Sequence, residues 1–252
     1  MDEKNHSNLN SVLKSWDSVE EAKKNLKLLG LPPHPDTIKS WDTYKIINFI
    51  KKFGNKESYL LDVGCNGSPI LPYLRLLGFH NLYGCDVDLE IRQRRFVRRI
   101  LNKVSNSNSQ KILDDMLLNN DNFYNLTIQD LEKTNYDSEM FDFISSLSVI
   151  EHGVNINNYF LEMSRILKNG GYLLTSTDYW PEKIEIQSNV YQRPGGDVIF
   201  NKNEIENLVT TAKKHSLNLC EPIDYSFGEK VVHWKKTGKD YTFIFFCLQK
   251  SA

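Results

Sequence analysis

The 252-residue sequence has no apolar run of membrane-spanning length, no large excess of charge of one sign and few cysteines. A transmembrane helix needs about 20 consecutive apolar residues, so none is expected here. The polar start of the chain also lacks the apolar core of a secretory signal peptide. A formal net charge of −1 gives no general attraction to nucleic acid or anionic lipid. The sequence therefore predicts a cytoplasmic protein without a membrane or nucleic-acid partner.

The cysteines give no metal-binding signal. The four of them show no CxxC spacing, and each lies in or just after an apolar run. A small thiol in such surroundings usually packs as a hydrophobic side chain. We therefore expect reduced thiols, and no zinc site, at Cys65, Cys85, Cys220 and Cys247.

Length and composition are those of a folded globular protein. Hydrophobic residues make up 40% of the chain and charged residues 25%. The length is enough for one large α/β domain with additions.

Apolar runs alternate with segments of helical periodicity along most of the chain. The expected strands are 59–63, 81–86, 125–129, 141–146, 172–177, 217–223 and 241–249. The expected helices are 70–77, 90–101, 111–122, 157–167 and 202–215. Strands that alternate with helices predict a mostly parallel sheet with helices on both faces, the doubly wound α/β class. No clear helix separates the last two strands, which favours an antiparallel final strand.

The first 55 residues are expected to add helices to this sheet. Apolar positions recur at helical spacing in 18–29 and 36–53, and a segment rich in proline separates the two. We expect residues 1–55 to form an N-terminal helical cap on a domain of residues 56–252, within a single structural domain overall.

The most informative segment is the loop after the first expected strand. The run from Leu60 to Val63 opens into the small-residue loop Gly64-Cys65-Asn66-Gly67-Ser68. The next strand ends in Asp86, 22 residues after Gly64. A tight loop lets backbone amides approach a ligand, and an acid at the end of the next strand accepts hydrogen bonds from ribose hydroxyls. This arrangement predicts a nucleoside site at the carboxyl edge of a parallel sheet.

The loop resembles motif I of the class I S-adenosylmethionine (SAM)-dependent methyltransferases, Asp/Glu-x-Gly-x-Gly-x-Gly. Asp62 and Gly64 match the motif, whereas Asn66 and Ser68 replace its second and third glycines. Gly67 supplies a glycine one position away. A dinucleotide-binding Gly-x-Gly-x-x-Gly beginning at Gly64 fails at two of its three glycines, so SAM is favoured over NAD.

Two later segments resemble the same family. Residues 141–152, which end in Ser-Val-Ile-Glu-His, resemble its fourth strand and the Glu-His that follows. Residues 165–174 resemble its Arg-x-Leu-Lys-Pro-Gly-Gly turn into the fifth strand, with Asn169 in place of proline. The motifs cover about residues 57–180 in the family's order. The resemblance implies a seven-stranded sheet with an antiparallel last strand, and SAM above the first four strands.

The resemblance also implies nine cofactor-binding positions. These are Asp62, Gly64, Cys65 and Asn66 at the methionine end, Asp86 and Val87 at the ribose and adenine, Asp130 and Leu131 at the adenine, and Leu147 near the sulfonium. From the residues alone, Asp130 is equally well explained as a helix N-cap.

Methyl transfer from a sulfonium needs an aligned acceptor, and a hydroxyl acceptor also needs a base or a metal. His152 is the best candidate base because it follows the strand at the catalytic edge. The alternative is that Glu151 and His152 only shape the loop. Spacing alone does not establish a metal site of Glu151, His152 and Asp178, and we expect no metal.

The segment 178–200 is expected to be a substrate lid. It is rich in aromatic residues, which offer flat apolar walls, and contains an arginine that suits an anionic group. The alternative is an aromatic mini-core that closes an irregular segment. The candidate substrate-binding residues are Tyr179, Trp180, Tyr191 and Arg193, together with Trp41 and Tyr44 from the N-terminal helix.

Five arginines are clustered between residues 92 and 99, apart from the cofactor motifs. Phosphate binding is one interpretation, but helical spacing spreads these arginines over a broad face. A solvated helix face is the interpretation that we favour.

The sequence therefore predicts an enzyme that transfers a methyl group from SAM to a small-molecule acceptor. A hydroxyl is the expected acceptor group, and a sugar or glycan precursor is one acceptor class. The first alternative is an RNA-modifying methyltransferase. Low net charge and the Ser-Ser-Leu-Ser sequence at 145–148, in place of Asn/Asp-Pro-Pro-aromatic, argue against it. The second is a catalytically inert SAM-binding module, which the replaced motif glycines leave open.

Overall fold

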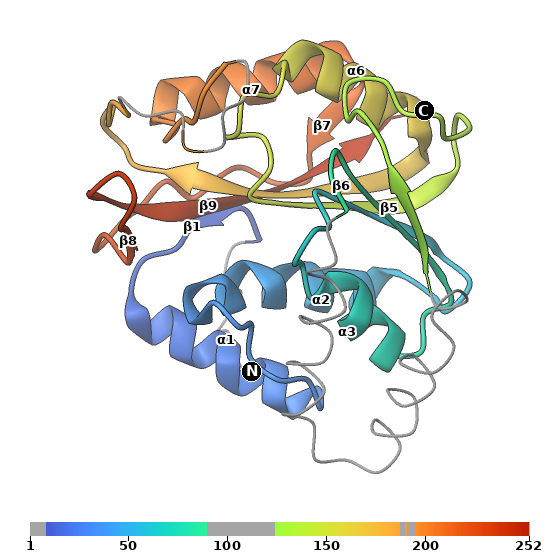
Figure 1. Cartoon of the computed structure of the whole chain (residues 1–252), viewed down its shortest axis with the longest axis horizontal. Helices are drawn as coiled ribbons and strands as arrows, with labels where there is room; N and C mark the ends of the chain where they lie inside the picture. The colour runs from blue at the N-terminus through green and yellow to red at the C-terminus, as the bar shows by residue number, and fades with distance from the viewer. Residues whose placement is uncertain (1–8, 90–123, 187–189, 191–194, 252) are drawn as a thin grey trace.

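The computed structural model describes residues 9–89, 124–186, 190 and 195–251. Its centre is a sheet with strands in the order β4-β3-β2-β5-β6-β9-β1, and β7 and β8 also pair with β9 (Figure 1). The strands are β1 (Ser11–Val12), β2 (Tyr59–Val63), β3 (Asn81–Asp86), β4 (Asn125–Ile128), β5 (Phe141–Leu147), β6 (Leu167–Tyr179), β7 (Leu217–Leu219), β8 (Val232–Trp234) and β9 (Lys239–Lys250). The helices are α1 (Trp16–Leu28), the 3-10 helix η1 (Thr37–Lys39), α2 (Ser40–Phe53), α3 (Ile70–Leu76), α6 (Ile156–Ile166) and α7 (Lys202–Lys214).

The strands from β4 to β6 are parallel to one another, and β9 runs antiparallel to β6. Strands covered by helices on both faces are mostly buried, which agrees with the largely apolar starts of β2 and β5, whereas Asp62, Ser145 and Ser146 lie near their carboxyl ends. The expected doubly wound α/β sheet, mostly parallel with an antiparallel last strand, is confirmed. The described residues form nine strands where seven were expected, because the short strands β1 and β8 add to the set.

The extra strands cover the edge of β9. β7, β1 and β8 pair with successive parts of this long strand, all of them antiparallel. Asn10 is fully buried and hydrogen-bonds to β9 and to the segment that follows β7. Its Oδ1 accepts a hydrogen bond from the Cys247 amide at 2.8 Å, and its Nδ2 donates to the Glu221 carbonyl at 2.6 Å. The residues before α1 therefore contribute a strand to the sheet. An edge of unpaired amides and carbonyls would otherwise be open to other chains.

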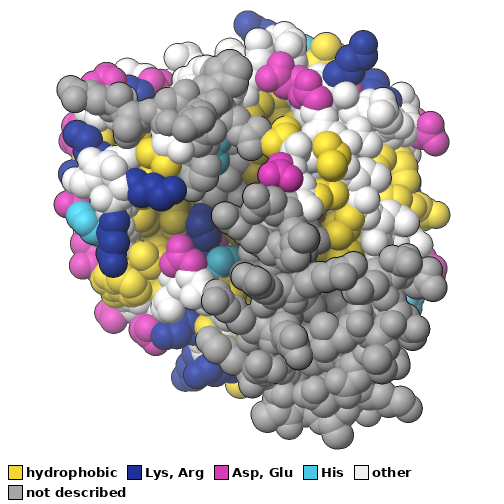
Figure 2. Space-filling model, in the orientation of Figure 1, with side chains coloured by type: hydrophobic (Ala, Val, Ile, Leu, Met, Phe, Trp, Pro, Cys, Tyr) yellow, Lys and Arg dark blue, Asp and Glu magenta, His cyan; other side chains and the backbone are white. Residues whose placement is uncertain are grey.

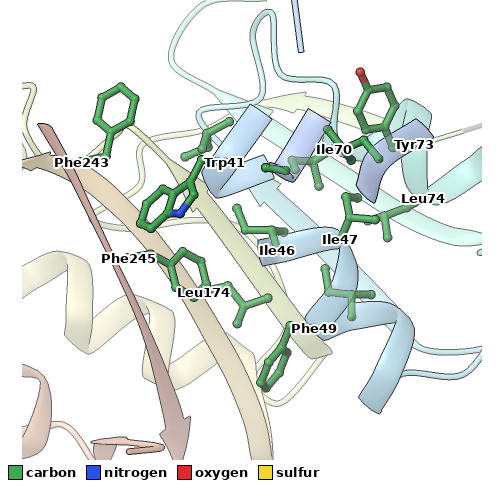
Figure 3. Packing of buried hydrophobic residues seen from close by; sticks show 14 of the residues in the cluster. Trp41, Ile46, Ile47, Phe49, Ile70, Tyr73, Leu74, Leu174, Phe243 and Phe245 are labelled. Atoms are coloured by element: carbon green, nitrogen blue, oxygen red, sulfur yellow. The ribbon is translucent and has the colours of Figure 1, made fainter. Parts of the chain in front are cut away.

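Helices lie on both faces of the sheet, with α1, α2 and α3 on one and α6 and α7 on the other (Figure 1). Figure 3 shows Trp41 and Ile46 of α2 beside Leu174 and Phe245 of the sheet, within one buried cluster. The opposite face has its own cluster, to which α6 and α7 contribute Tyr159, Phe160, Met163, Ile205 and Leu208.

Helix ends follow local sequence rules. Ser15 accepts a hydrogen bond from the Ser18 amide at the start of α1, and Asn201 and Glu204 form a capping box at α7. The expected bounds of α1, α6 and α7 hold to within two residues. The predicted turn at 168–171 falls at a register shift within β6, where Leu167 pairs with Phe141 and Tyr172 with Phe143, and Gly170 between them has a φ of 80°. The expected helices 90–101 and 111–122 lie outside the described residues.

Within the described ranges, none of the helices combines the length and apolar character needed to cross a membrane.

Candidate active site

The loop after β2 bends sharply at Gly64. This residue has a φ of 68°, and its amide donates to the Cys85 carbonyl at the end of β3 over 2.8 Å. A Cβ at Gly64 would lie 2.5 Å from Cγ2 of Val149, in the loop after β5. Only glycine adopts this conformation and passes Val149 without displacing it. The loop that leaves β2 is therefore held against the ends of both neighbouring strands.

Asn66 ties the loop to the end of β3. Its amide donates to Oδ2 of Asp86 at 3.1 Å, and its side-chain nitrogen donates to the Asp88 carbonyl at 3.1 Å. The left-handed residue of this turn is Gly67, with a φ of 86°, and Asn66 itself has no positive φ. The asparagine in place of the second motif glycine thus links two loops.

Asp86 uses both carboxylate oxygens to order its surroundings. Oδ2 accepts from Asn66, and Oδ1 accepts from the Val87 amide at 2.8 Å. Oδ1 also accepts from the Asp88 amide at 3.4 Å, so Oδ2 keeps the second lone pair that can accept a hydrogen bond from a ligand hydroxyl. Val87 is 40% exposed, which is high for a valine. The end of β3 therefore presents an acceptor beside an apolar surface.

Asp62 carries the strongest sign of a ligand at this loop. The residue is 1% exposed, and its Oδ1 accepts from the Ser145 hydroxyl at 2.6 Å. Among the described residues, Oδ2 of Asp62 and Oδ1 of Asn66 have no hydrogen-bond partner. Buried acceptors are almost always satisfied, so these two fit a ligand donor such as an ammonium group. Burial raises the pKa of Asp62 to about 7, although the hydrogen bond from the Ser145 hydroxyl acts in the opposite direction.

The remaining predicted cofactor positions lie at the same edge of the sheet. Cys65 is buried in the loop, Leu147 is the last residue of β5, and Asp130 and Leu131 follow β4. Because β2, β3, β4 and β5 are parallel, their carboxyl ends meet at one edge. Asp130 Oδ1 accepts from the Glu132 amide at 2.9 Å. Asp130 therefore caps a turn and not a helix.

His152 forms a pair with Asp197, a residue that the sequence reasoning did not select. Nδ1 of His152 lies 2.9 Å from Oδ1 of Asp197, whose side chain is 1% exposed. Oδ2 of Asp197 accepts from the Val190 amide at 2.6 Å. Backbone pairing brings the two together, since the Val198 amide donates to the Glu151 carbonyl at 2.9 Å. Nothing in the sequence joins residues 45 positions apart.

Three further buried carboxylates lie on α2, after β5 and at the end of β6, and the charges of Asp42 and Glu151 act on Asp178. Asp42 accepts from the Ser176 hydroxyl at 2.8 Å, and Glu151 accepts from the Thr177 hydroxyl at 2.9 Å. Burial raises the pKa of Asp42 to about 6. Burial and then the neighbouring Glu151 raise the pKa of Asp178 well above its usual value. Across the described ranges, no group of three or more His, Cys, Asp or Glu side chains is arranged to hold a metal ion.

Most of the predicted substrate-binding aromatics serve the core. Trp41 is 7% exposed and lies beside Phe243 and Phe245 (Figure 3). Tyr179 is fully buried, with its ring centroid 6.3 Å from that of Tyr225. Tyr44 of α2 is partly buried and packs against the same hydrophobic cluster as Trp41. Of these three residues only Tyr179 belongs to the segment 178–200, and its burial agrees with the mini-core interpretation.

Trp180 is the remaining described candidate. It is partly exposed, its ring centroid lies 5.3 Å from that of Phe227, and Nζ of Lys230 lies 4.6 Å from the ring centre. The other two candidates, Tyr191 and Arg193, lie outside the described residues, as do the arginines between 92 and 99.

Comparison with known proteins agrees with this geometry. The profile of a methyltransferase domain family matches residues 38–212, more than half of the chain. The chain therefore belongs to the methyltransferase domain family, and the expected class, a SAM-dependent methyltransferase, is confirmed. No curated protein matches the chain in sequence.

Solved structures share the fold at low sequence identity. A SAM-dependent methyltransferase of Methanosarcina mazei is 15% identical, with 81% of this chain and 97% of that chain covered and a TM-score of 0.53. The 1,6-didemethyltoxoflavin-N1-methyltransferase of Burkholderia thailandensis, solved with S-adenosylhomocysteine, is 11% identical, with 84% and 77% covered and a TM-score of 0.55. The cyclase SpnF is 13% identical, with 93% and 97% covered and a TM-score of 0.57. These likenesses concern the fold alone.

Proposed function

We propose that this chain transfers a methyl group from SAM to a hydroxyl group of a small molecule, with His152 as the general base. The observation that carries the proposal is the His152–Asp197 pair at the carboxyl edge of the sheet, where Nδ1 and Oδ1 lie 2.9 Å apart. A deprotonated acceptor oxygen attacks a methyl group more readily than a hydroxyl does. A base at this edge is therefore the chemistry that a hydroxyl acceptor requires.

The loop after β2 and the end of β3 supply the cofactor site in this proposal. Asp62 and Asn66 receive the amino group at the methionine end through their unpartnered buried oxygens. Asp86 accepts from the ribose hydroxyls, and Val87 contacts the adenine. When bound, SAM supplies an electrophilic methyl group on a sulfonium sulfur. Two solved relatives of the fold carry SAM or its demethylated product, which supports the assignment.

The Asp197 carboxylate fixes the state of His152. A carboxylate beside Nδ1 favours the tautomer with a proton on that nitrogen, so that Nε2 bears the lone pair. Asp197 is itself held by the Val190 amide, so the pair has a defined orientation. His152 then takes the proton from the acceptor hydroxyl, and the developing imidazolium is stabilised by the buried Asp197.

A small molecule is the favoured acceptor class. The net charge is −1, and on the described part of the face in Figure 2 the basic side chains are interspersed with acidic ones. Nucleic-acid sites instead gather basic side chains in a patch or a stripe. Trp180 provides a flat apolar wall at the end of β6, which suits a sugar ring, so sugar-containing acceptors and glycan precursors are tested first.

The test is release of S-adenosylhomocysteine across a panel of acceptors. The panel contains sugars, phenols, amines, thiols and a short RNA, and the product is measured by mass spectrometry. We expect turnover with a hydroxyl compound, and a loss of about 10²–10⁴ in turnover for His152→Ala at nearly constant SAM affinity. His215→Ala is the matched control, because His215 lies beyond α7 and contacts Asn157.

Three outcomes would contradict the proposal. Turnover only with amines or thiols would remove the hydroxyl acceptor. Turnover only with RNA would favour the RNA-modifying alternative. A His152→Ala variant that keeps activity within a few-fold of the unmodified protein would exclude the base.

A further inference from the structure

Two cysteines face each other across the junction of β7 and β9. Leu219, the last residue of β7, pairs with Leu248, so the following residue, Cys220, stands opposite Cys247. The Cys220 amide donates to the Cys247 carbonyl at 3.0 Å. The two sulfur atoms lie 3.1 Å apart, and both residues are free thiols. This pairing joins positions 27 residues apart, and the sequence spacing gives no sign of it.

The backbone already has the geometry of a disulfide. Residues opposite each other on antiparallel strands have Cα atoms about 4.5–5.5 Å apart. Disulfides span Cα separations of about 4.4–6.8 Å, with a sulfur–sulfur bond of about 2.05 Å. Closing the bond from 3.1 Å therefore needs a movement of only about 1 Å, which side-chain rotation provides.

We propose that Cys220 and Cys247 are a reversible thiol–disulfide pair that takes a small disulfide oxidant, such as oxidised glutathione, as co-reactant. This inference rests on the positions of the two cysteines in the fold and does not depend on the identity of the methyl acceptor.

The two thiols have different roles in the exchange. Cys220 is exposed and can meet the oxidant, whereas Cys247 is buried directly behind it. The hydrogen bond from Cys247 lowers the pKa of the Cys220 thiol, and burial raises that of Cys247. A lower thiol pKa increases the fraction present as the nucleophilic thiolate. Cys220 is therefore the attacking residue and Cys247 the resolving residue.

The reaction balances as two exchanges. The Cys220 thiolate attacks one sulfur of oxidised glutathione, which forms a mixed disulfide and releases the first glutathione thiolate. Cys247 then loses its proton, and its thiolate attacks the sulfur of Cys220 and releases the second glutathione thiolate. Two cysteine thiols have then been oxidised by two electrons, and one glutathione disulfide has been reduced to two thiols.

The chain contains its own internal comparison. Cys65 and Cys85 are 2% and 0% exposed, so no oxidant reaches them in the folded protein. Burial also raises the pKa of the Cys85 thiol, which disfavours its thiolate. We therefore expect oxidation at one pair of cysteines and not at the other.

The experiment treats the full chain with oxidised glutathione, blocks the remaining thiols with an alkylating reagent and maps the digested peptides by mass spectrometry. We expect a peptide pair linked through Cys220 and Cys247, alkylation of Cys65 and Cys85 only after unfolding, and reversal by dithiothreitol. Cys247→Ser should instead retain glutathione on Cys220, because the resolving thiol is missing. Cys220→Ser, a change at an exposed position, should show neither product.

Several outcomes would overturn the inference. In the unmodified protein these are alkylation of both Cys220 and Cys247 after treatment, a stable glutathione adduct on Cys220 without the link, or a disulfide between two chains. The unmodified protein carries the decisive result, so the proposal remains testable even if a variant folds poorly.

Discussion

The two halves of the carboxyl edge of the sheet are built in different ways. In the half proposed to hold the cofactor, after β2 and β3, the loop is tied to the end of the next strand by the Asn66 amide and Asp86, 20 residues apart, and a longer side-chain hydrogen bond joins Asp62 to Ser145 over 83 residues. In the acceptor half, after β5 and β6, the contacts are long in sequence. His152 reaches Asp197 over 45 residues, and Asp42 reaches Ser176 over 134.

This difference predicts which half of the edge tolerates amino-acid substitution. A loop that is closed by local backbone contacts needs particular residues at fixed positions, above all a glycine. An edge that is assembled from distant segments can exchange those segments while the sheet remains the same. We therefore expect substitutions in the cofactor half to affect SAM binding, and substitutions in the acceptor half to affect turnover or the choice of acceptor.

The largest effect on binding is expected at Gly64. In Gly64→Ala, the new Cβ would lie 2.5 Å from Val149 at a φ of 68°, so the loop must move. We expect SAM affinity to fall at least 100-fold, about 2.7 kcal/mol, in a calorimetric titration. Gly30→Ala is the control, because Gly30 has a φ of 76° but no atom within 4 Å of its added Cβ.

A second substitution sharpens this test. Val149→Ala in the Gly64→Ala background removes the atom that the new Cβ meets, and should restore part of the lost affinity. Normal SAM binding in Gly64→Ala alone would show that the ligand lies elsewhere. Equal losses in Gly64→Ala and Gly30→Ala would assign the effect to backbone strain and not to the loop.

The next largest effect is expected in the dependence of SAM affinity on pH. Burial raises the pKa of Asp62 to about 7, so the protein without ligand takes up a proton there as the pH falls below 7. An ammonium group favours the ionised carboxylate, so SAM affinity should fall by up to about tenfold per pH unit between pH 7 and pH 5. Titrations of Asp62→Asn should lack this slope. A slope that is unchanged in Asp62→Asn would assign it to another group.

The smallest effect is expected in the aromatic segment, where two neighbours should differ. Tyr179 is fully buried, and its hydroxyl has no hydrogen-bond partner among the described residues. Tyr179→Phe should therefore change the free energy of unfolding by less than about 0.5 kcal/mol, or increase it slightly, and leave acceptor use unchanged. Trp180→Ala should raise the KM for the acceptor at constant SAM affinity. A large change in acceptor KM for Tyr179→Phe would contradict its place in the core.

Sequence reasoning succeeded where structure is local. The order of strands and helices from β2 to α7 follows from apolar runs and helical periodicity. The bounds of α1, predicted from apolar spacing as 18–29, hold to within two residues, and the prediction missed the cap at Ser15 that sets the start. The loop at Asp62 and Gly64 was recognisable because close backbone approach restricts residue types.

The rest depends on contacts that no local pattern contains. β1 exists because β9 offers it an open edge, and Asn10 is held by Cys247, 237 residues away. Asp197 is brought beside His152 by backbone pairing between two irregular segments that are distant in the sequence. Tryptophan occurs both in substrate sites and in cores, so the sequence does not distinguish the two roles for Trp41. Its burial, at 7% exposed, places it in the core.

The most direct test of the account is a calorimetric titration with SAM of three proteins: the unmodified chain, Asp86→Ala and Asp197→Asn. Asp86 is in the cofactor half and Asp197 in the acceptor half, and both are aspartates with two hydrogen-bonded oxygens. We predict that Asp86→Ala weakens SAM binding by about 1.5–3 kcal/mol, roughly 10–150-fold, because the ribose hydroxyls lose a charged acceptor. Asp197→Asn should bind SAM as the unmodified chain does. Absence of binding to the unmodified chain, or equal affinities of Asp86→Ala and the unmodified chain, would contradict the account.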